Sequence, residues 1–332
     1  MVSRNRAIAI GAVVAGAVGI AVAARRTPAV RRLLDGEDWL LHEPTVDYRI
    51  VPVVTDDGAH LHVREYGDPD AEPIVLSHGW TCSADFWAPQ VNALAGKYRV
   101  IAYDQRGHGS SDLGTRHFGP DVLGDDLAAI LEATITSDQK AVLAGHSMGG
   151  MSVMAWAGDH AKQVQQYVKA ILLADTASDS LIAETTVVPR FPRIPARVAT
   201  SVLSSGLPIP TTPFSSRAVK YVALGRYATP AQVAFCEKIV RECEPKTRGL
   251  WGAALSALDI HEALENIDVP TTVIVGTADR LTPPTQSRKL AAALERAGVL
   301  DRLVEVPDAG HMVSVEAIDA FNAELVRLAE EN

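Results

Sequence analysis

The sequence predicts an α/β fold built on a mostly parallel, doubly wound sheet. Three observations predict it: 47% apolar and 21% charged residues over 332 positions, short apolar runs of strand length, and amphipathic helical stretches between several of these runs. Short buried strands that alternate with helices are typical of a parallel sheet covered on both faces. We also expect a helical cap inserted into the sheet domain and a hydrophobic N-terminal helix.

Residues 1–25 are predicted to be a hydrophobic N-terminal anchor or signal. Residues 7–24 read AIAIGAVVAGAVGIAVAA, without a charge or a polar side chain. As a helix this segment is about 27 Å long, close to the ~30 Å hydrocarbon core of a bilayer. We expect a retained membrane anchor. The alternatives are a signal peptide cleaved near Ala21-Val22-Ala23, which implies secretion, and a buried or peripheral helix.

Arginines flank this segment unequally. Two precede it and four follow it (Arg25, Arg26, Arg31 and Arg32), and the positive-inside bias therefore slightly favours a cytoplasmic globule. The net charge is −9, and the six arginines leave about −15 on the rest of the chain. Such an acidic globule repels phosphate backbones, and the sequence has no basic stripe with interleaved aromatics, so we expect no nucleic-acid partner.

Residues 26–47 are an arginine-rich linker to the sheet domain, which comprises residues 48–175 and 265–332. The domain opens with two β-type runs, Arg49–Val54 and Ala59–Glu65, separated by Asp56-Asp57-Gly58. This pattern predicts a hairpin at an antiparallel edge of the sheet. The other predicted strands are continuous apolar runs: Pro73–Leu76, Tyr98–Tyr103, Lys140–Ala144, Val168–Leu173, Pro270–Val275 and Arg302–Val306.

Helical stretches lie between several of these strands, at Val122–Ala133, Met148–His160 and Gln286–Ala297. The alternation is interrupted at residues 176–264, which contain no strand pattern and a cluster of prolines. Nearly ninety residues are too many for a simple loop, so we expect a helical cap there. Its aromatic side chains form either an apolar pocket or portal, or the core of the cap itself: Phe191, Phe214, Tyr221, Tyr227, Phe235 and Trp251.

The candidate nucleophile is Ser147, in the motif Gly145-His146-Ser147-Met148-Gly149. This G-x-S-x-G sequence stands between a predicted strand and a predicted helix, which is the setting of a nucleophile elbow. The two flanking glycines leave space for a strained turn in which a Cβ would clash with neighbouring backbone. The turn also places the serine at a helix N-terminus, which favours negative charge. The alternative is a purely structural turn.

A serine nucleophile needs a base and an acid that orients it, in the chain order Ser, Asp, His. Asp279 and His311 each follow a predicted strand, in loops at the carboxyl edge of the sheet, where ligand-facing loops of open α/β sheets gather. Asp175 is the alternative acid, and Asp279 would then cap the helix that begins near Pro283. Asp308 is interpreted as a turn residue.

The oxyanion of an acyl-transfer intermediate needs hydrogen-bond donors. We expect one donor to be the backbone N–H of Met148 and the other the backbone N–H of Trp80, because Gly79 permits a sharp bend before it. This machinery requires no metal and no cofactor, and the three cysteines lack both disulfide and metal-site spacing. Three nearby histidines are interpreted as structural: His78, His108 and His146.

The set HGW, DQRGHGSS, GHSMGG, GTADRLTPP and GHM, in this order, resembles the α/β-hydrolase superfamily over about residues 48–328. HGWTCSADFW and the Asp-Gln-Arg-Gly-His-Gly loop are similar to its branch of serine esterases, lipases and cofactor-free haloperoxidases. The resemblance implies Ser147 as nucleophile, His311 as base and Asp279 as the acid that orients it. Epoxide hydrolases and haloalkane dehalogenases carry an aspartate at the elbow, so those activities are not expected.

We therefore expect a serine hydrolase that cleaves carboxylic ester bonds through an acyl-serine intermediate, with an apolar small-molecule ester or a lipid as substrate. Two enzymatic alternatives use the same triad: a C–C hydrolase and a perhydrolase or haloperoxidase-like enzyme. A third alternative is a non-catalytic, ligand-binding α/β-hydrolase fold, since fold does not determine function. The sequence does not identify the residues that bind the substrate.

Overall fold

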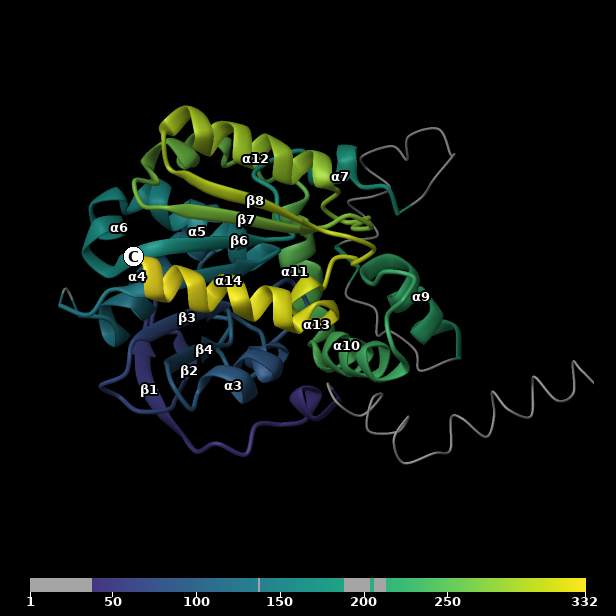
Figure 1. Ribbon diagram of the computed structural model, residues 1–332, viewed down its shortest axis with the longest axis horizontal. Helices are drawn as coiled ribbons and strands as arrows, with labels where there is room; N and C mark the ends of the chain where they lie inside the picture. Colours follow the sequence, from purple (N-terminus) through teal and green to yellow (C-terminus); the bar gives the residue numbers. More distant parts are fainter. Residues whose placement is uncertain (1–37, 137, 188–203, 206–212) are drawn as a thin grey trace, which may run out of the picture.

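The computed structural model describes residues 38–136, 138–187, 204–205 and 213–332 (Figure 1). The predictions for residues 1–37, including the hydrophobic segment 7–24, lie outside the described residues. Among the helices that the structure does describe, none combines the length and the apolar character needed to cross a bilayer. The predicted fold class is confirmed, because the described chain forms a mostly parallel sheet covered by helices.

The described strands form one mixed, eight-stranded sheet in the order β1-β2-β4-β3-β5-β6-β7-β8. Strand β1 pairs with β2, and β2 with β4, in antiparallel fashion, and all other neighbours are parallel. Strands β3, β4, β5 and β7 are buried along their whole length, as expected where helices cover both faces. The bounds are β1 Tyr48–Val54, β2 His60–Tyr66, β3 Pro73–Ser77, β4 Arg99–Tyr103, β5 Ala141–His146, β6 Val168–Ala174, β7 Thr271–Gly276 and β8 Leu300–Val306.

The predicted hairpin forms one edge of the sheet, with β1 outermost. Gly58, in the turn, has φ +82°, a left-handed conformation that glycine adopts without strain. In β1, Val51 and Val53 point into the core, whereas Tyr48 and Ile50 are exposed. The hairpin therefore leaves an apolar row of edge-strand side chains in solvent.

Helices cover both faces of the sheet. On one face, α4, α5 and α12 contribute Leu127, Trp156 and Leu290 to a buried apolar cluster. On the other face, α3 and α14 contribute Val91 and Phe321 to a second cluster, and Figure 1 shows α14 crossing in front of the sheet. The bounds of these and the smaller helices are η1 Asp38–Leu41, η2 Ala84–Trp87, α3 Ala88–Leu94, α4 Pro120–Thr134, α5 Met148–Asp159, α6 Ala161–Tyr167, α12 Pro284–Ala297, α13 Val313–Glu316 and α14 Ile318–Glu331.

The described residues between β6 and β7 are helical, with α7 Leu181–Glu184, α9 Pro213–Ala223, α10 Pro230–Glu242, α11 Pro245–Leu255 and η3 His261–Asn266. Figure 1 shows α9, α10 and α11 gathered at the end of the sheet where β6 and β7 terminate. Helix α11 is fastened to the loop after β4, because the Trp251 indole N–H donates to the Arg106 carbonyl at 2.9 Å and the Thr247 hydroxyl to the Gly107 carbonyl at 2.8 Å.

The aromatic residues of this segment do not share one environment. Trp251 is fully buried and packs edge-on against Phe118, so it belongs to the core. Phe235 is partly buried, whereas Tyr221 and Tyr227 are exposed. The placement of Phe191 and of the Phe214 side chain lies outside what the structure describes.

Candidate active site

Ser147 lies on a sharp turn between β5 and α5. Its backbone has φ 53° and ψ −117°, a conformation that residues with a side chain rarely adopt. A Cβ added to Gly145 would lie 2.5 Å from the carbonyl oxygen of Gly149, and one added to Gly149 would overlap the carbonyl oxygen of Ser77. The glycines on both sides of the serine are therefore required by the close approach of three backbone segments.

The structure brings the three predicted triad side chains into contact. Ser147 Oγ lies 3.0 Å from His311 Nε2, although the two residues are 164 positions apart. His311 Nδ1 lies 2.9 Å from Asp279 Oδ2. With Nδ1–H donating to the carboxylate, Nε2 is left as an acceptor for the serine hydroxyl. This arrangement can remove a proton from Ser147 and stabilise the imidazolium that results.

Thr282, which the sequence reasoning did not select, completes the surroundings of the acid. Its hydroxyl donates to Asp279 Oδ2 at 2.7 Å and lies 3.2 Å from His311 Nδ1. The other oxygen, Oδ1, accepts the backbone N–H groups of Leu281 and Thr282. The signal that could have selected Thr282 is its position three residues after Asp279, since an aspartate often accepts backbone N–H groups from residues two or three positions later. Helix α12 has Pro283 as its N-cap, so Asp279 does not cap it.

Asp175, the alternative acid, has a different position. It is fully buried, and its two carboxylate oxygens accept the backbone N–H groups of Gly276 at 2.9 Å and Val313 at 3.0 Å. Burial, with the nearby charge of Asp279, raises the pKa of Asp175 well above its ordinary value. Asp175 therefore joins the loops that carry the acid and the base, and Asp279 is the residue that contacts His311.

Glu316 fixes the loop of His311 to the end of α9. One carboxylate oxygen accepts the Gly310 N–H at 2.8 Å and the other the Gly225 N–H at 2.7 Å. Burial raises the pKa of Glu316 above its ordinary value. Asp308, interpreted as a turn residue, has φ 62°. The sequence contains no motif that would have selected Glu316, because its partners come from two separate loops.

The predicted oxyanion donors lie beside the serine. Met148 is the first residue of α5, directly after Ser147. A Cβ added to Gly79 would lie 3.1 Å from the Ser147 Cβ, so the loop of Gly79 and Trp80 closely approaches the nucleophile. Within the described residues, no backbone hydrogen bond uses the N–H of Trp80 or Met148. Both N–H groups remain the candidates to donate to a ligand oxygen.

Two buried histidines hold this loop in place. The Nε2 of His78 accepts the Gln105 N–H at 2.9 Å, and its Nδ1 lies 2.8 Å from the Gly79 carbonyl. The Nε2 of His108 accepts the N–H of Thr81 at 3.3 Å. Burial lowers the pKa of both imidazoles, that of His108 to about 3, so each is neutral and keeps an acceptor nitrogen. Their role in this structure is to brace the loop.

Two further contacts link the parts of the site. The Nε2–H of His146 donates to the His311 carbonyl at 2.7 Å, and burial lowers the pKa of His146 well below its ordinary value. The indole N–H of Trp80 donates to the Arg248 carbonyl of α11 at 3.1 Å. The elbow is thereby tied to the loop of the base, and the oxyanion loop to the inserted helices.

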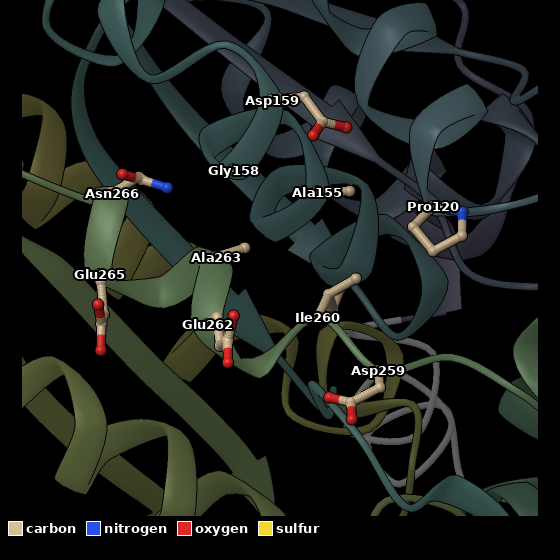
Figure 2. A pocket seen from close by; sticks show the side chains of 10 residues that line it. All are labelled: Pro120, Ala155, Gly158, Asp159, Asp259, Ile260, Glu262, Ala263, Glu265 and Asn266. Atoms are coloured by element: carbon tan, nitrogen blue, oxygen red, sulfur yellow. The ribbon is translucent and has the colours of Figure 1, made fainter.

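A surface pocket of about 440 Å³ lies at the C-terminal end of α5, beside η3 (Figure 2). Its walls carry the carboxylates of Asp159, Asp259, Glu262 and Glu265, and none of its lining residues belongs to the triad. Throughout the described ranges, no group of three or more His, Cys, Asp or Glu side chains is placed to hold a metal ion.

Comparisons with known proteins agree with this geometry. A family model for the alpha/beta hydrolase fold matches residues 72–318. A non-heme chloroperoxidase of Burkholderia pyrrocinia is 29% identical over 84% of this chain and 99% of its own length. A bifunctional esterase/perhydrolase of Acinetobacter calcoaceticus is 28% identical over 82% and 97%. The crystal structure of the enol-lactonase from Burkholderia xenovorans LB400 superimposes with a TM-score of 0.65 and 26% identity, covering 83% of this chain and 98% of that one.

Proposed function

The chain belongs to the α/β-hydrolase family, and on that premise we propose that it is a serine hydrolase that cleaves carboxylic esters. The observation that carries the proposal is the continuous line of contacts from Ser147 Oγ to His311 Nε2, and from His311 Nδ1 to Asp279 Oδ2. A purely ligand-binding protein has no need of this alignment at a strained turn. The relatives named as an esterase/perhydrolase and an enol-lactonase support ester bonds as the target.

The proposed reaction has two steps. Ser147 Oγ forms a bond to the ester carbonyl carbon while its proton passes to His311 Nε2, and the N–H groups of Trp80 and Met148 donate to the oxyanion. The alcohol then leaves with the proton from His311. In the second step water attacks the carbonyl carbon of the acyl-serine while its proton passes to the same nitrogen. The bond between that carbon and Ser147 Oγ then breaks, His311 returns the proton to Oγ, and the acid is released. Asp279 orients the imidazole in both steps.

For the substrate we propose a small ester with an apolar acyl group. The motivation is the apolar segment 7–24, which would bring the enzyme to a source of lipid-like esters. A series of p-nitrophenyl esters of increasing acyl length tests this part separately from the nucleophile. A steady fall in kcat/KM beyond acetate would contradict it.

Labelling with a fluorophosphonate probe tests the nucleophile. We expect the full chain to be labelled and to hydrolyse p-nitrophenyl acetate, and the Ser147→Ala variant to do neither. Ser83→Ala is the matched control, because this nearby loop serine makes no side-chain cap hydrogen bond; it should behave as the wild type. Labelling or turnover retained in Ser147→Ala would refute serine catalysis.

A second activity on the same acyl-serine is favoured by the relatives named as a chloroperoxidase and as an esterase/perhydrolase. If hydrogen peroxide attacks the acyl-serine in place of water, the product is a peracid, and the proton again passes to His311. Peracid yield from an ester at increasing peroxide concentration measures this partition. An absence of peracid while hydrolysis continues would exclude perhydrolysis.

A further inference from the structure

Two exposed tyrosines lie on and just after α9, each with an arginine against its ring. Tyr221 is 43% exposed and Tyr227 is 69% exposed. The guanidinium carbon of Arg280 is 4.8 Å from the ring centroid of Tyr221, and that of Arg226 is 4.4 Å from the ring centroid of Tyr227. Each pair presents an aromatic ring and a positive charge at the same point of the surface.

Both pairs are attached to the loops of the proposed triad. Arg280 directly follows Asp279 and also donates to the Tyr221 carbonyl at 2.8 Å. Arg226 forms an ion pair with Asp308 at 3.0 Å, three residues before His311. Arg280 thus belongs to the loop of the acid, and Arg226 is joined to the loop of the base by its ion pair.

The charge of this surface is opposite to that of the whole protein. We define the aromatic–basic rim as Lys220, Tyr221, Arg226, Tyr227 and Arg280. In the part of the chain that the structure describes, the carboxylate of Asp308 balances Arg226, whereas Lys220 donates to the Ala228 carbonyl and Arg280 to the Tyr221 carbonyl. The rim is therefore positive on a chain of net charge −9, and it complements an anionic surface.

The described chain also begins at this end of the molecule. Helix η1 packs against α10, and its Trp39 is 54% exposed. The preceding sequence contains the uncharged segment 7–24 and four arginines between residues 25 and 32. Residues 25–37 span at most about 50 Å when fully extended. If segment 7–24 is held in a bilayer, the surface of that bilayer is within reach of α9 and α10.

We propose that the aromatic–basic rim docks on the surface of a bilayer that contains anionic phospholipid. Tyrosine combines an apolar ring with a polar hydroxyl and is enriched at membrane–water interfaces. Lysine and arginine near that surface are attracted to anionic headgroups. Docking in this way brings the loops of Asp279 and His311 to the lipid, so an ester leaving the bilayer meets the proposed site directly.

The edge hairpin offers a matched control for this proposal. Tyr48 is 50% exposed and has the guanidinium of Arg64 at 5.4 Å from its ring centroid, so it reproduces the tyrosine–arginine pair. Figure 1 shows β1 on the side of the molecule away from α9. A protein that binds lipid nonspecifically would bring both the edge hairpin and the aromatic–basic rim to the bilayer. The proposed docking brings only the rim.

The first experiment places an environment-sensitive fluorophore on the full chain through Tyr227→Cys or, as control, Tyr48→Cys. The native cysteines are buried, so the introduced thiol is the one that reacts under native conditions. With phosphatidylcholine vesicles containing phosphatidylglycerol, we expect a blue shift and quenching by spin-labelled lipid at position 227 and neither at position 48. No response at 227, an equal response at both positions, or an equal response to vesicles of phosphatidylcholine alone would overturn the proposal.

The second experiment compares the Tyr221→Ala/Tyr227→Ala double variant with Tyr48→Ala. We expect the double variant to hydrolyse an ester presented in anionic vesicles about tenfold more slowly, since it lacks two interfacial aromatic side chains, and a soluble short ester at the wild-type rate. The fluorescence result does not depend on catalysis. Docking without ester hydrolysis would refute the proposed function alone, and hydrolysis without docking would refute this inference alone.

Discussion

The hydroxyl of Thr282 allows a quantitative test of the proposed triad. Thr282→Val removes Oγ1 while keeping the shape of the side chain. The variant loses the 2.7 Å hydrogen bond to Asp279 Oδ2 and the hydroxyl that lies 3.2 Å from His311 Nδ1. Asp279 Oδ1 keeps both of its backbone donors. The substitution therefore removes a hydrogen bond from Asp279 Oδ2 only, which is the oxygen that accepts the imidazole N–H.

The expected loss follows from the strength of that bond. A hydrogen bond to a charged group contributes about 1.5–3 kcal/mol, and 1.36 kcal/mol corresponds to about a factor of ten in rate. If the carboxylate needs this bond to hold the imidazolium, kcat for an activated ester falls by roughly 10- to 100-fold. The KM should change little, because Thr282 acts on Asp279 and His311 and has no role in substrate binding in this mechanism.

The assay is steady-state hydrolysis of p-nitrophenyl acetate by the full chain, with urea unfolding to verify stability. Thr282→Ser should restore most of the rate, since it returns the hydroxyl. Thr134→Val is the matched control, because this buried threonine donates to a backbone carbonyl of α4 far from the site. The reasoning is refuted if Thr282→Val stays within twofold of the wild type in kcat, or if Thr134→Val loses as much.

Three further predictions concern the elbow, the core and pH. Gly149→Ala places a Cβ on the Ser77 carbonyl, so the rate of fluorophosphonate labelling should fall by roughly 5- to 100-fold, the equivalent of the ~1–3 kcal/mol that overpacking costs; unchanged labelling would contradict the clash. Arg106→Met leaves the buried Asp126 carboxylate without its ion-pair partner, and urea unfolding should show a loss of about 3–5 kcal/mol, whereas a loss below 1 kcal/mol would disprove the pairing. The pKa of His108 is lowered from 6.5 to about 3, so this imidazole binds a proton only in the unfolded chain over that range. Stability should therefore fall on acidification below pH 6.5, by about 1.4 kcal/mol per pH unit more than in His108→Gln; parallel pH profiles from urea unfolding would show that His108 is not held neutral.

Local patterns are sufficient to predict the sheet, the hairpin and the elbow. The Asp57-Gly58 turn and the glycines around Ser147 are encoded within a few residues, and so is the position of Asp279 and His311 after their strands. Local pattern cannot reveal contacts made between distant loops. Asp175, Glu316 and Thr282 have their roles only because several strand ends meet at one edge of the sheet.

The orientation of the inserted helices was also beyond local pattern. Trp251 and Tyr221 are both aromatic residues on helices of the same insert, yet one is fully buried and the other exposed. The difference arises because α11 lies against the loop after β4, through Trp251 and Thr247, while α9 presents Tyr221 to solvent. The aromatics that the structure describes therefore do not share one environment, since Trp251 lies in the core and Tyr221 is exposed.

The attachment of α11 sets a limit on how much of the helical insert can be exchanged with that of a relative. A chimaera that replaces everything between β6 and β7 discards the acceptor of the Trp80 indole and the donors to the Arg106 and Gly107 carbonyls. A transplant from a relative should therefore end before Pro245 and keep α11 with the recipient. Although α11 is inserted with the other helices, its contacts make it part of the support of the sheet domain. The part of the insert that can be exchanged therefore ends with α10.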